Sequence, residues 1–171
     1  MKKVYTVFET DWGFVAAIWT ERGLWQNGFP RRDKEQALAD ITIVEGIQKA
    51  REELFVDPVT NEIRRYFDGG KVQFDLPIDW TGYTQFQAAV LAHTYRIPYG
   101  EVTTYGQLAA AVGSPGAARA VGGALHINRT PIVIPCHRVL GKGGSLTGFG
   151  GGIEVKRALL EWEEKEPERN K

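Results

Sequence analysis

Cysteine, methionine and histidine are scarce in this chain of 171 residues, which has one Cys, one Met and three His. A single cysteine cannot form an internal disulfide, and His93, His126 and His137 lack the spacing of a zinc site. We therefore expect no disulfide and no metal, and we interpret His93 and His126 as ordinary helix residues. No apolar run approaches the ~20 residues of a membrane span, and the N-terminus lacks a signal-peptide pattern. These absences predict a soluble, intracellular protein without a membrane partner.

Acidic residues are missing from a long internal segment, although the net charge of the whole chain is zero. No Asp or Glu lies between Glu101 and Glu154. The basic residues of that segment are Arg119, Arg129, Arg138 and Lys142. Such a segment suits a surface that approaches phosphates. It equally suits a buried core rich in Ala, Gly and Val, and the composition alone does not choose between the two.

Residues 1–80 have the pattern of a small α+β domain that serves as a scaffold. β-branched and aromatic residues predict strands at 5–8 and 14–19 and a third strand from Leu24. Mixed apolar spacing predicts a helix within 31–54, ended by Asp57-Pro58, and a short helix over 62–67. Residues 71–78 alternate between polar and apolar and are expected to be extended.

Residues 81–171 form a second predicted domain, which follows a linker at 79–83. Thr84 is expected to cap a helix that reaches Tyr95, and Thr103 or Thr104 to cap a helix over 105–112. Ser114, followed by Pro115, is expected to cap a third helix over 117–125. Two short helices around a glycine-containing turn are a candidate helix-turn-helix.

The third helix has almost no side-chain bulk apart from Arg119. Gly122 and Gly123 are adjacent, and each glycine costs a helix about 1 kcal/mol. Close approach to a narrow DNA groove would compensate for that cost, and so would close helix packing inside the domain. Arg119 suits a place in a base stack or a phosphate contact, or alternatively a surface salt bridge.

Residues 131–140, PIVIPCHRVL, hold the only cysteine. The apolar run 132–134 is expected to be buried and extended, with Cys136 at its end. A thiol attacks carbon only as the thiolate, so it needs a nearby base such as His137. Neighbours on a strand point to opposite faces, so a turn or a water would have to join these two residues. From these residues alone, Cys136 is more commonly a small buried hydrophobe than a nucleophile.

A set of motifs that extends well beyond residues 131–140 favours Cys136 as a nucleophile over Cys136 as a buried hydrophobe. The motifs are PCHRV at 135–139, FQ at 86–87, IPYGE at 97–101, YGQLA at 105–109, AARAVGGA at 117–124, Asn128, GF at 148–149 and KRALL at 156–160. In order and spacing, this set resembles the O6-alkylguanine-DNA alkyltransferase (methylated-DNA–protein-cysteine methyltransferase) family. The resemblance is strong over about 84–163 and weaker before it, where YFDG at 66–69 agrees.

The resemblance implies an α+β fold. A ribonuclease H-like N-terminal domain (1–80), with a small antiparallel sheet and a helix, precedes a mostly helical domain (81–171) that holds the helix-turn-helix and the cysteine. The implied function is direct-reversal DNA repair, in which the alkyl group of O6-alkylguanine, and also of O4-alkylthymine, moves irreversibly to Cys136. The helix-turn-helix would bind the minor groove and flip the base. The implied partner is double-stranded DNA, in the cytoplasm at nucleoid or nuclear DNA, with no cofactor and no obligate protein partner.

The resemblance also assigns residue roles. The catalytic set comprises Cys136, His137, Glu163 and Tyr105. The DNA-binding set comprises Arg119, Tyr105, Gly106, Ser114, Ala118 and Gly122. The base pocket comprises Val139, Asn128, Phe149 and Gly150, and no residue is assigned to a metal.

Some features depart from the family pattern. Phe149 stands where the family usually has tyrosine, and the glycine run 150–152 is more flexible than usual. The cysteine and histidine set of zinc-containing relatives is missing. Two other functions compete: a non-catalytic relative that only binds alkylated DNA, which Cys136 argues against, and a thiol hydrolase, which only Cys136-His137 supports.

Overall fold

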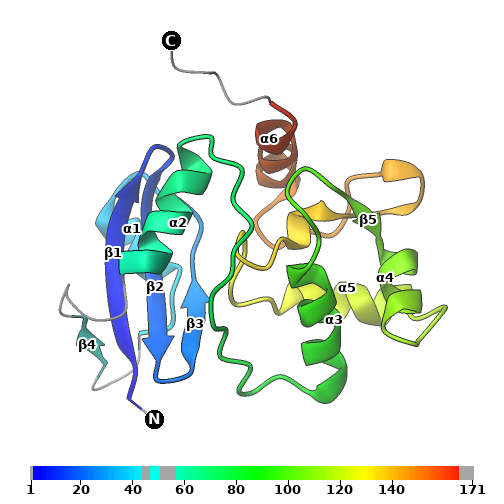
Figure 1. Ribbon diagram of the computed structural model, residues 1–171, viewed down its shortest axis with the longest axis horizontal. Helices are drawn as coiled ribbons and strands as arrows, with labels where there is room; N and C mark the ends of the chain where they lie inside the picture. Colours follow the sequence, from blue (N-terminus) through cyan, green and yellow to red (C-terminus); the bar gives the residue numbers. More distant parts are fainter. Residues whose placement is uncertain (1, 44–46, 51–56, 166–171) are drawn as a thin grey trace. The chain divides into compact units, whose positions relative to one another are not determined.

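The computed structural model describes residues 2–43, 47–50 and 57–165 (Figure 1). The chain divides into two compact units, Met1–Trp80 and Thr81–Lys171. Within the described ranges, no helix is both long and apolar enough to cross a membrane.

A four-stranded sheet with the order β3-β2-β1-β4 forms the N-terminal unit. Its strands are β1 (Val4–Thr10), β2 (Gly13–Thr20), β3 (Gly23–Asn27) and β4 (Gln48–Lys49). The first three pair antiparallel, as predicted, whereas the short β4 pairs parallel with β1. At Gly23, with φ of +130°, a Cβ would lie 2.1 Å from the Pro77 carbonyl oxygen, so no larger residue fits this turn.

Two helices accompany the sheet, α1 (Lys34–Ala39) and α2 (Asp57–Phe67). The predicted long helix over 31–54 is wrong, because α1 ends at Ala39 and the chain then pairs with β1 through β4. Backbone pairing along the sheet edge outweighs the helical spacing of a segment that contains the β-branched run at 41–43. The remainder of that prediction, at 44–46 and 51–54, lies outside the described residues. Asp57-Pro58 begins a helix instead of ending one, as suits proline in a first turn.

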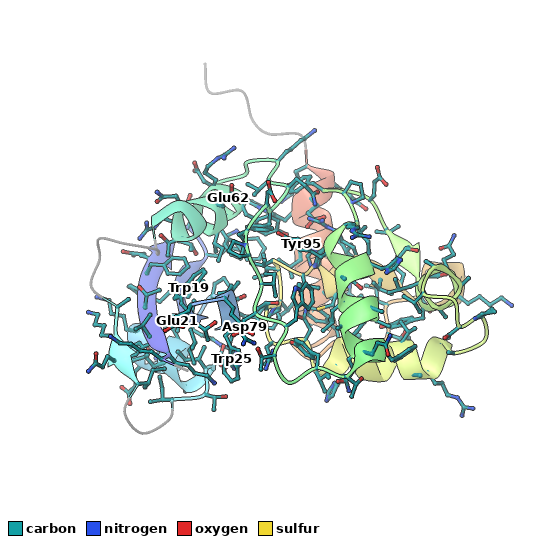
Figure 2. All side chains as sticks on the ribbon, turned by 60° about the horizontal axis from the view of Figure 1, so that its bottom comes forward. Trp19, Glu21, Trp25, Glu62, Asp79 and Tyr95 are labelled. Carbon is teal, nitrogen blue, oxygen red and sulfur yellow. The ribbon has the colours of Figure 1, made fainter. Side chains whose placement is uncertain are left out.

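Residues 71–78 alternate in burial as predicted, with the side chains of Val72, Phe74, Leu76 and Ile78 all buried. Backbone hydrogen bonds from Leu24 N–H to Pro77 O, and from Asp79 N–H to Leu24 O, hold the end of this segment against β3. Asp79, which is labelled in Figure 2, is buried. It accepts a hydrogen bond from the Thr20 hydroxyl of β2.

The C-terminal unit is mostly helical. Its elements are α3 (Gln85–Tyr95), β5 (Thr103–Thr104), α4 (Tyr105–Ala111), α5 (Ala118–His126), the 3-10 helix η1 (Cys136–Arg138), β6 (Val139–Leu140), the 3-10 helix η2 (Lys142–Gly144) and α6 (Ile153–Glu164). The caps predicted at Thr84 and Thr104 are confirmed, each with a glutamine that completes a capping box. β5 and β6 pair in parallel and bring the N-terminus of α4 to the end of η1.

Helices α4 and α5 pack together as the helix-turn-helix (Figure 1). The cap predicted at Ser114 is wrong, because α5 begins at Ala118 and its N-cap, Ala117, makes no side-chain capping bond. Ser114 instead belongs to the capping motif that follows α4: its N–H donates to Ala109 O, and the N–H of Gly113 donates to Ala110 O. With Gly113 at φ of +75°, this is a Schellman motif.

Candidate active site

A buried turn precedes the cysteine. Ile134 N–H donates to Thr130 O at 2.8 Å, and Ile132 has φ of +74°, the only positive φ of a non-glycine residue within the described ranges. The run 132–134 is buried as predicted, but the prediction that it is extended is wrong. Left-handed backbone is costly for a β-branched residue, and the core around Ile132, which is 1% exposed, holds it in place.

Cys136 lies at the start of η1, and the residue is only 8% exposed. The Asn128 amide donates to Cys136 Sγ at 3.2 Å and to Ile134 O at 2.9 Å. The orientation of this amide is fixed, because its oxygen accepts from Thr130 N–H at 3.0 Å. The structure therefore gives Asn128 a direct thiol contact that the sequence did not reveal.

His137 and Glu163 meet in the interior, where His137 Nε2 lies 2.6 Å from Glu163 Oε1. Arg138 contacts both oxygens of the same carboxylate, with Nε 2.8 Å from Oε2 and Nη2 2.9 Å from Oε1. Gly100 N–H donates to Oε2 at 3.1 Å, so four donors satisfy the buried carboxylate. Arg138 also donates to Ile97 O at 2.6 Å.

The protonation states follow from this network. Burial alone would raise the pKa of Glu163, but the hydrogen bonds and charges of His137 and Arg138 outweigh it and lower the pKa to about 2. Burial lowers the pKa of His137, and Glu163 only partly opposes this. A neutral imidazole that faces an ionised carboxylate carries its proton on Nε2. His137 Nδ1 is then an unprotonated base, and it is buried without a hydrogen-bond partner among the described residues.

The thiol itself is protonated at rest, because burial raises the pKa of Cys136. The Asn128 hydrogen bond, the charge of Lys156 and the backbone N–H groups of Cys136 and His137 oppose that rise. These groups all stabilise the thiolate. The arrangement therefore suits a thiol that is deprotonated by a nearby base only when it reacts.

Lys156 is a buried cation of the site that the sequence prediction missed. Its Nζ donates to Val139 O at 2.6 Å and to Thr147 O at 3.1 Å, and it lies 5.7 Å from the Tyr105 ring centre and 5.9 Å from that of Phe149. Burial lowers the pKa of Lys156, whereas Cys136 raises it. The buried residues of α6 are Lys156, Leu159 and Glu163, and this i, i+3, i+7 spacing was a signal for an inward-facing lysine.

The Tyr105 hydroxyl, at the N-terminus of α4, lies 2.9 Å from Thr147 O and 3.1 Å from Gly148 O. Tyr105 and Lys156 thus hold the same loop, which joins η2 to α6. Phe149 on this loop is half-buried, and Gly150 is exposed with no atom within 4 Å of a Cβ placed there. Of the predicted base-pocket residues, Asn128 and Val139 contact the thiol or Lys156 directly, and Phe149 lies near Lys156.

The exposed face of α5 carries Arg119, which has no ion pair within the described ranges. A Cβ at Gly123 or at Gly106 would meet no atom within 4 Å, so internal packing does not require glycine at either position. A Cβ at Gly122 would lie 3.9 Å from the Tyr105 ring. The described structure therefore offers neither a salt bridge for Arg119 nor a packing reason for Gly123.

The segment 102–153, which contains no acidic residue and is called here the acid-free segment, is neither wholly a phosphate-binding surface nor wholly a buried core. Arg138 is buried against Glu163 and is no phosphate ligand, and Arg129 donates to Thr81 O. Arg119 and Lys142 remain exposed. Half of its basic residues therefore stabilise the unit, and the other half are available at the surface.

The fold and site together define a class: a two-unit α+β protein whose C-terminal unit joins a helix-turn-helix to a buried cysteine with a histidine–carboxylate pair. Residues 85–165 match the family described as 6-O-methylguanine DNA methyltransferase, DNA binding domain. A methylated-DNA–protein-cysteine methyltransferase of Methanosarcina acetivorans is 35% identical over 93% of this chain and 97% of its own length. The chain therefore belongs to the methylated-DNA–protein-cysteine methyltransferase family.

Other relatives agree. The Mycobacterium tuberculosis enzyme of the same name is 50% identical over 60% of this chain and 62% of its own length, so the match spans less than two thirds of that relative. A crystal structure of Mycobacterium tuberculosis OGT in complex with DNA has a TM-score of 0.76 and 36% identity, covering 94% of this chain and 92% of that one. That likeness confirms the predicted α+β fold.

Proposed function

We propose that this chain repairs DNA by moving the alkyl group of O6-alkylguanine, once and irreversibly, to Cys136. The observation that carries the proposal is the thiol of Cys136, held by Asn128 and followed by a histidine that is bound to Glu163. The family's curated relatives carry the name of this activity, and the Mycobacterium tuberculosis structure contains DNA. The activity would need no cofactor, and we propose the DNA-containing part of the cytoplasm, or the nucleus, as its place.

The helix-turn-helix would dock α4 and α5 on the minor groove. Small residues suit this groove because its width excludes bulky side chains, and Gly106, Ala118 and Gly122 belong to these two helices, while Ser114 lies in the turn between them. The alkylated oxygen lies on the pairing edge of guanine, so the nucleotide has to leave the stack. Arg119, exposed at the start of α5, would occupy the space that the nucleotide leaves.

Transfer begins with the thiol proton, which would pass to His137 Nδ1 through a water molecule. The thiolate then attacks the alkyl carbon, a carbon–sulfur bond forms, and the bond from carbon to O6 breaks. Guanine leaves with the electron pair of that bond and takes a proton from the Tyr105 hydroxyl. The proton held by His137 then restores the Tyr105 hydroxyl. The net result moves the thiol proton to guanine and leaves a thioether. A thioether is stable, so one protein molecule repairs one lesion.

The loop after Thr147 would close the base pocket. Lys156 and the Tyr105 hydroxyl hold the carbonyl of Thr147, and the Val139 carbonyl keeps a lone pair that can accept from the guanine amino group. Phe149 contributes its ring without a hydroxyl, and Gly150 adds no side chain. We propose that this pocket also admits O4-alkylthymine.

A stoichiometric titration tests the proposal. The protein is incubated with an excess of duplex that carries O6-methylguanine, and the methyl groups transferred per protein molecule are counted. A plateau near one, abolished by Cys136→Ala, is expected. Continuous turnover would indicate a hydrolase, and binding without transfer would indicate a non-catalytic damage-binding protein, and either result would overturn the proposal.

A further inference from the structure

Two segments of the C-terminal unit are fastened together beside the active site. The Tyr83 hydroxyl accepts hydrogen bonds from the Arg129 backbone N–H at 3.0 Å and from Arg129 Nε at 3.2 Å. The same hydroxyl donates to Ile127 O at 3.4 Å. We call this arrangement the Tyr83–Arg129 clamp, and it joins the start of the unit to the turn that follows α5.

Ring stacking and a second backbone contact complete the clamp. The Arg129 guanidinium lies 4.1 Å from the centre of the Tyr83 ring, and its Nη2 donates to Thr81 O at 2.8 Å. A Cβ at Gly82 would lie 3.5 Å from Arg129 Nη1, so the backbone between Thr81 and Tyr83 runs along the guanidinium. The polar groups of this turn are therefore held from several directions at once.

Asn128 lies between the two residues that the Tyr83 hydroxyl contacts. The amide of Asn128 donates to Cys136 Sγ and to Ile134 O, and its oxygen accepts from Thr130 N–H. Hydrogen bonds weaken steeply as their angle departs from linear. A small rotation of the backbone at 127–129 would therefore weaken the contact of Asn128 with the thiol.

We propose that Tyr83 is a positioning residue for the reaction of Cys136: its hydroxyl fixes the 127–129 turn so that the Asn128 amide meets the sulfur. The effect on alkyl transfer rests on the proposed function. The effect on the thiol does not, because any thiol reagent reports it. The hydrogen bonds of the Tyr83 hydroxyl reach Ile127 and Arg129, on either side of Asn128, so Tyr83 acts on the thiol through this turn.

Other groups around the thiol set the size of the effect. The charge of Lys156 on α6 and the backbone N–H groups of η1 also favour the thiolate. Further titratable or charged groups of this site, among the described residues, are Tyr105 on α4, His137 with Glu163 and Arg138 behind it, and Tyr99 beside Arg138. Asn128 is therefore one contributor among several, and loss of the clamp should weaken thiolate formation without abolishing it.

The test replaces Tyr83 by phenylalanine, which keeps the ring over the guanidinium and removes only the hydroxyl. Tyr5→Phe, on β1 of the other unit, is the matched control. The rates of iodoacetamide alkylation and of transfer from free O6-benzylguanine are measured against pH. We expect the Tyr83→Phe curves to move to higher pH by about half a unit, which is about a threefold loss of rate at neutral pH. The rates should converge with wild type at high pH, and Tyr5→Phe should not differ from wild type.

Combining Tyr83→Phe with Asn128→Ala tests whether Tyr83 acts through Asn128. If Tyr83 acts through Asn128, then Tyr83→Phe has no further effect in the Asn128→Ala protein. An unchanged curve, an equal loss at every pH or an additive effect in that background would each overturn the proposal. Arg129→Ala, which keeps the backbone N–H, should shift the curve less in the same direction and serves if Tyr83→Phe does not fold. Wild type that reacts with iodoacetamide but takes no methyl group from duplex DNA carrying O6-methylguanine would refute the proposed function while leaving the clamp testable.

Discussion

Replacing Glu163 by glutamine removes the negative charge from the centre of the buried network and changes little else in shape. The new side-chain amide would retain one acceptor for Arg138, whose guanidinium would remain buried without a counter-charge. The fixed tautomer of His137 would also be lost, because an amide can face Nε2 with either its oxygen or its NH2 group. The substitution should therefore lower both stability and reactivity.

The structure sets the size of the stability loss. The pKa of Glu163 falls from its ordinary 4.5 to about 2, and this difference corresponds to about 3 kcal/mol of the free energy of unfolding. Removing one partner of a buried ion pair typically costs about 3–5 kcal/mol, which agrees. Because the folded pKa is depressed, this stabilisation is present above pH 4.5 and is lost as the pH falls towards 2. Burial also depresses the pKa of His137, so its contribution is lost as the pH falls below 6.5.

Urea unfolding of wild type and Glu163→Gln at a series of pH values measures the difference. We expect about 3 kcal/mol near pH 7 and a progressive decrease below pH 4.5 as wild-type Glu163 becomes protonated. The rate of transfer from free O6-benzylguanine at pH 7 should fall by about tenfold or more, since His137 is no longer held by Glu163 as an oriented base. A difference that stays constant down to pH 3, or none at pH 7, would refute this account of Glu163.

Three further substitutions probe the other parts of the site. Arg119→Ala should reduce repair of duplex DNA by about tenfold or more, because base flipping loses a few kcal/mol of stabilisation. The reaction with free O6-benzylguanine should be unchanged. Equal losses on both substrates would mean that Arg119 supports the fold. Gly123→Leu should leave the free energy of unfolding equal or slightly raised, because leucine favours helix and the position is open. The same substitution should weaken DNA binding in a gel-shift assay. Normal binding would show that Gly123 is not part of the DNA-binding face. Lys156→Met should move the pH profile of iodoacetamide alkylation to higher pH, because the thiolate loses a nearby positive charge; an unshifted profile would show that Lys156 acts only on the loop.

Local interactions explain which parts of the fold could be predicted. The caps at Thr84 and Thr104 depend on a glutamine three residues later. Thr84 was predicted correctly, and the structure chooses Thr104 from the two predicted candidates Thr103 and Thr104. Ser114 misled the prediction because a serine after a glycine suits a helix N-cap and the end of a Schellman motif equally well. The helix expected over 31–54 failed because β4 finds its partner in β1, far away in the sequence.

In the active site too, some residues could be predicted from the sequence and others could not. The resemblance pointed to Cys136, His137 and Glu163, and the structure brings His137 and Glu163 together, although their catalytic roles remain a prediction. Arg138 looked like a surface cation in the acid-free segment, and only the folded unit shows it buried against a carboxylate 25 residues later. The Tyr83–Arg129 clamp joins residues 46 apart, and no local pattern predicts it.

Peptide mass mapping tests the central claim most directly. The protein is incubated with duplex DNA that carries O6-methylguanine, digested, and compared with protein that was incubated with undamaged duplex. We predict that the peptide containing Cys136 gains one methyl group in place of a hydrogen, and that all other peptides are unchanged. A methyl group on another residue, or no modification of Cys136 while the DNA is repaired, would contradict the account.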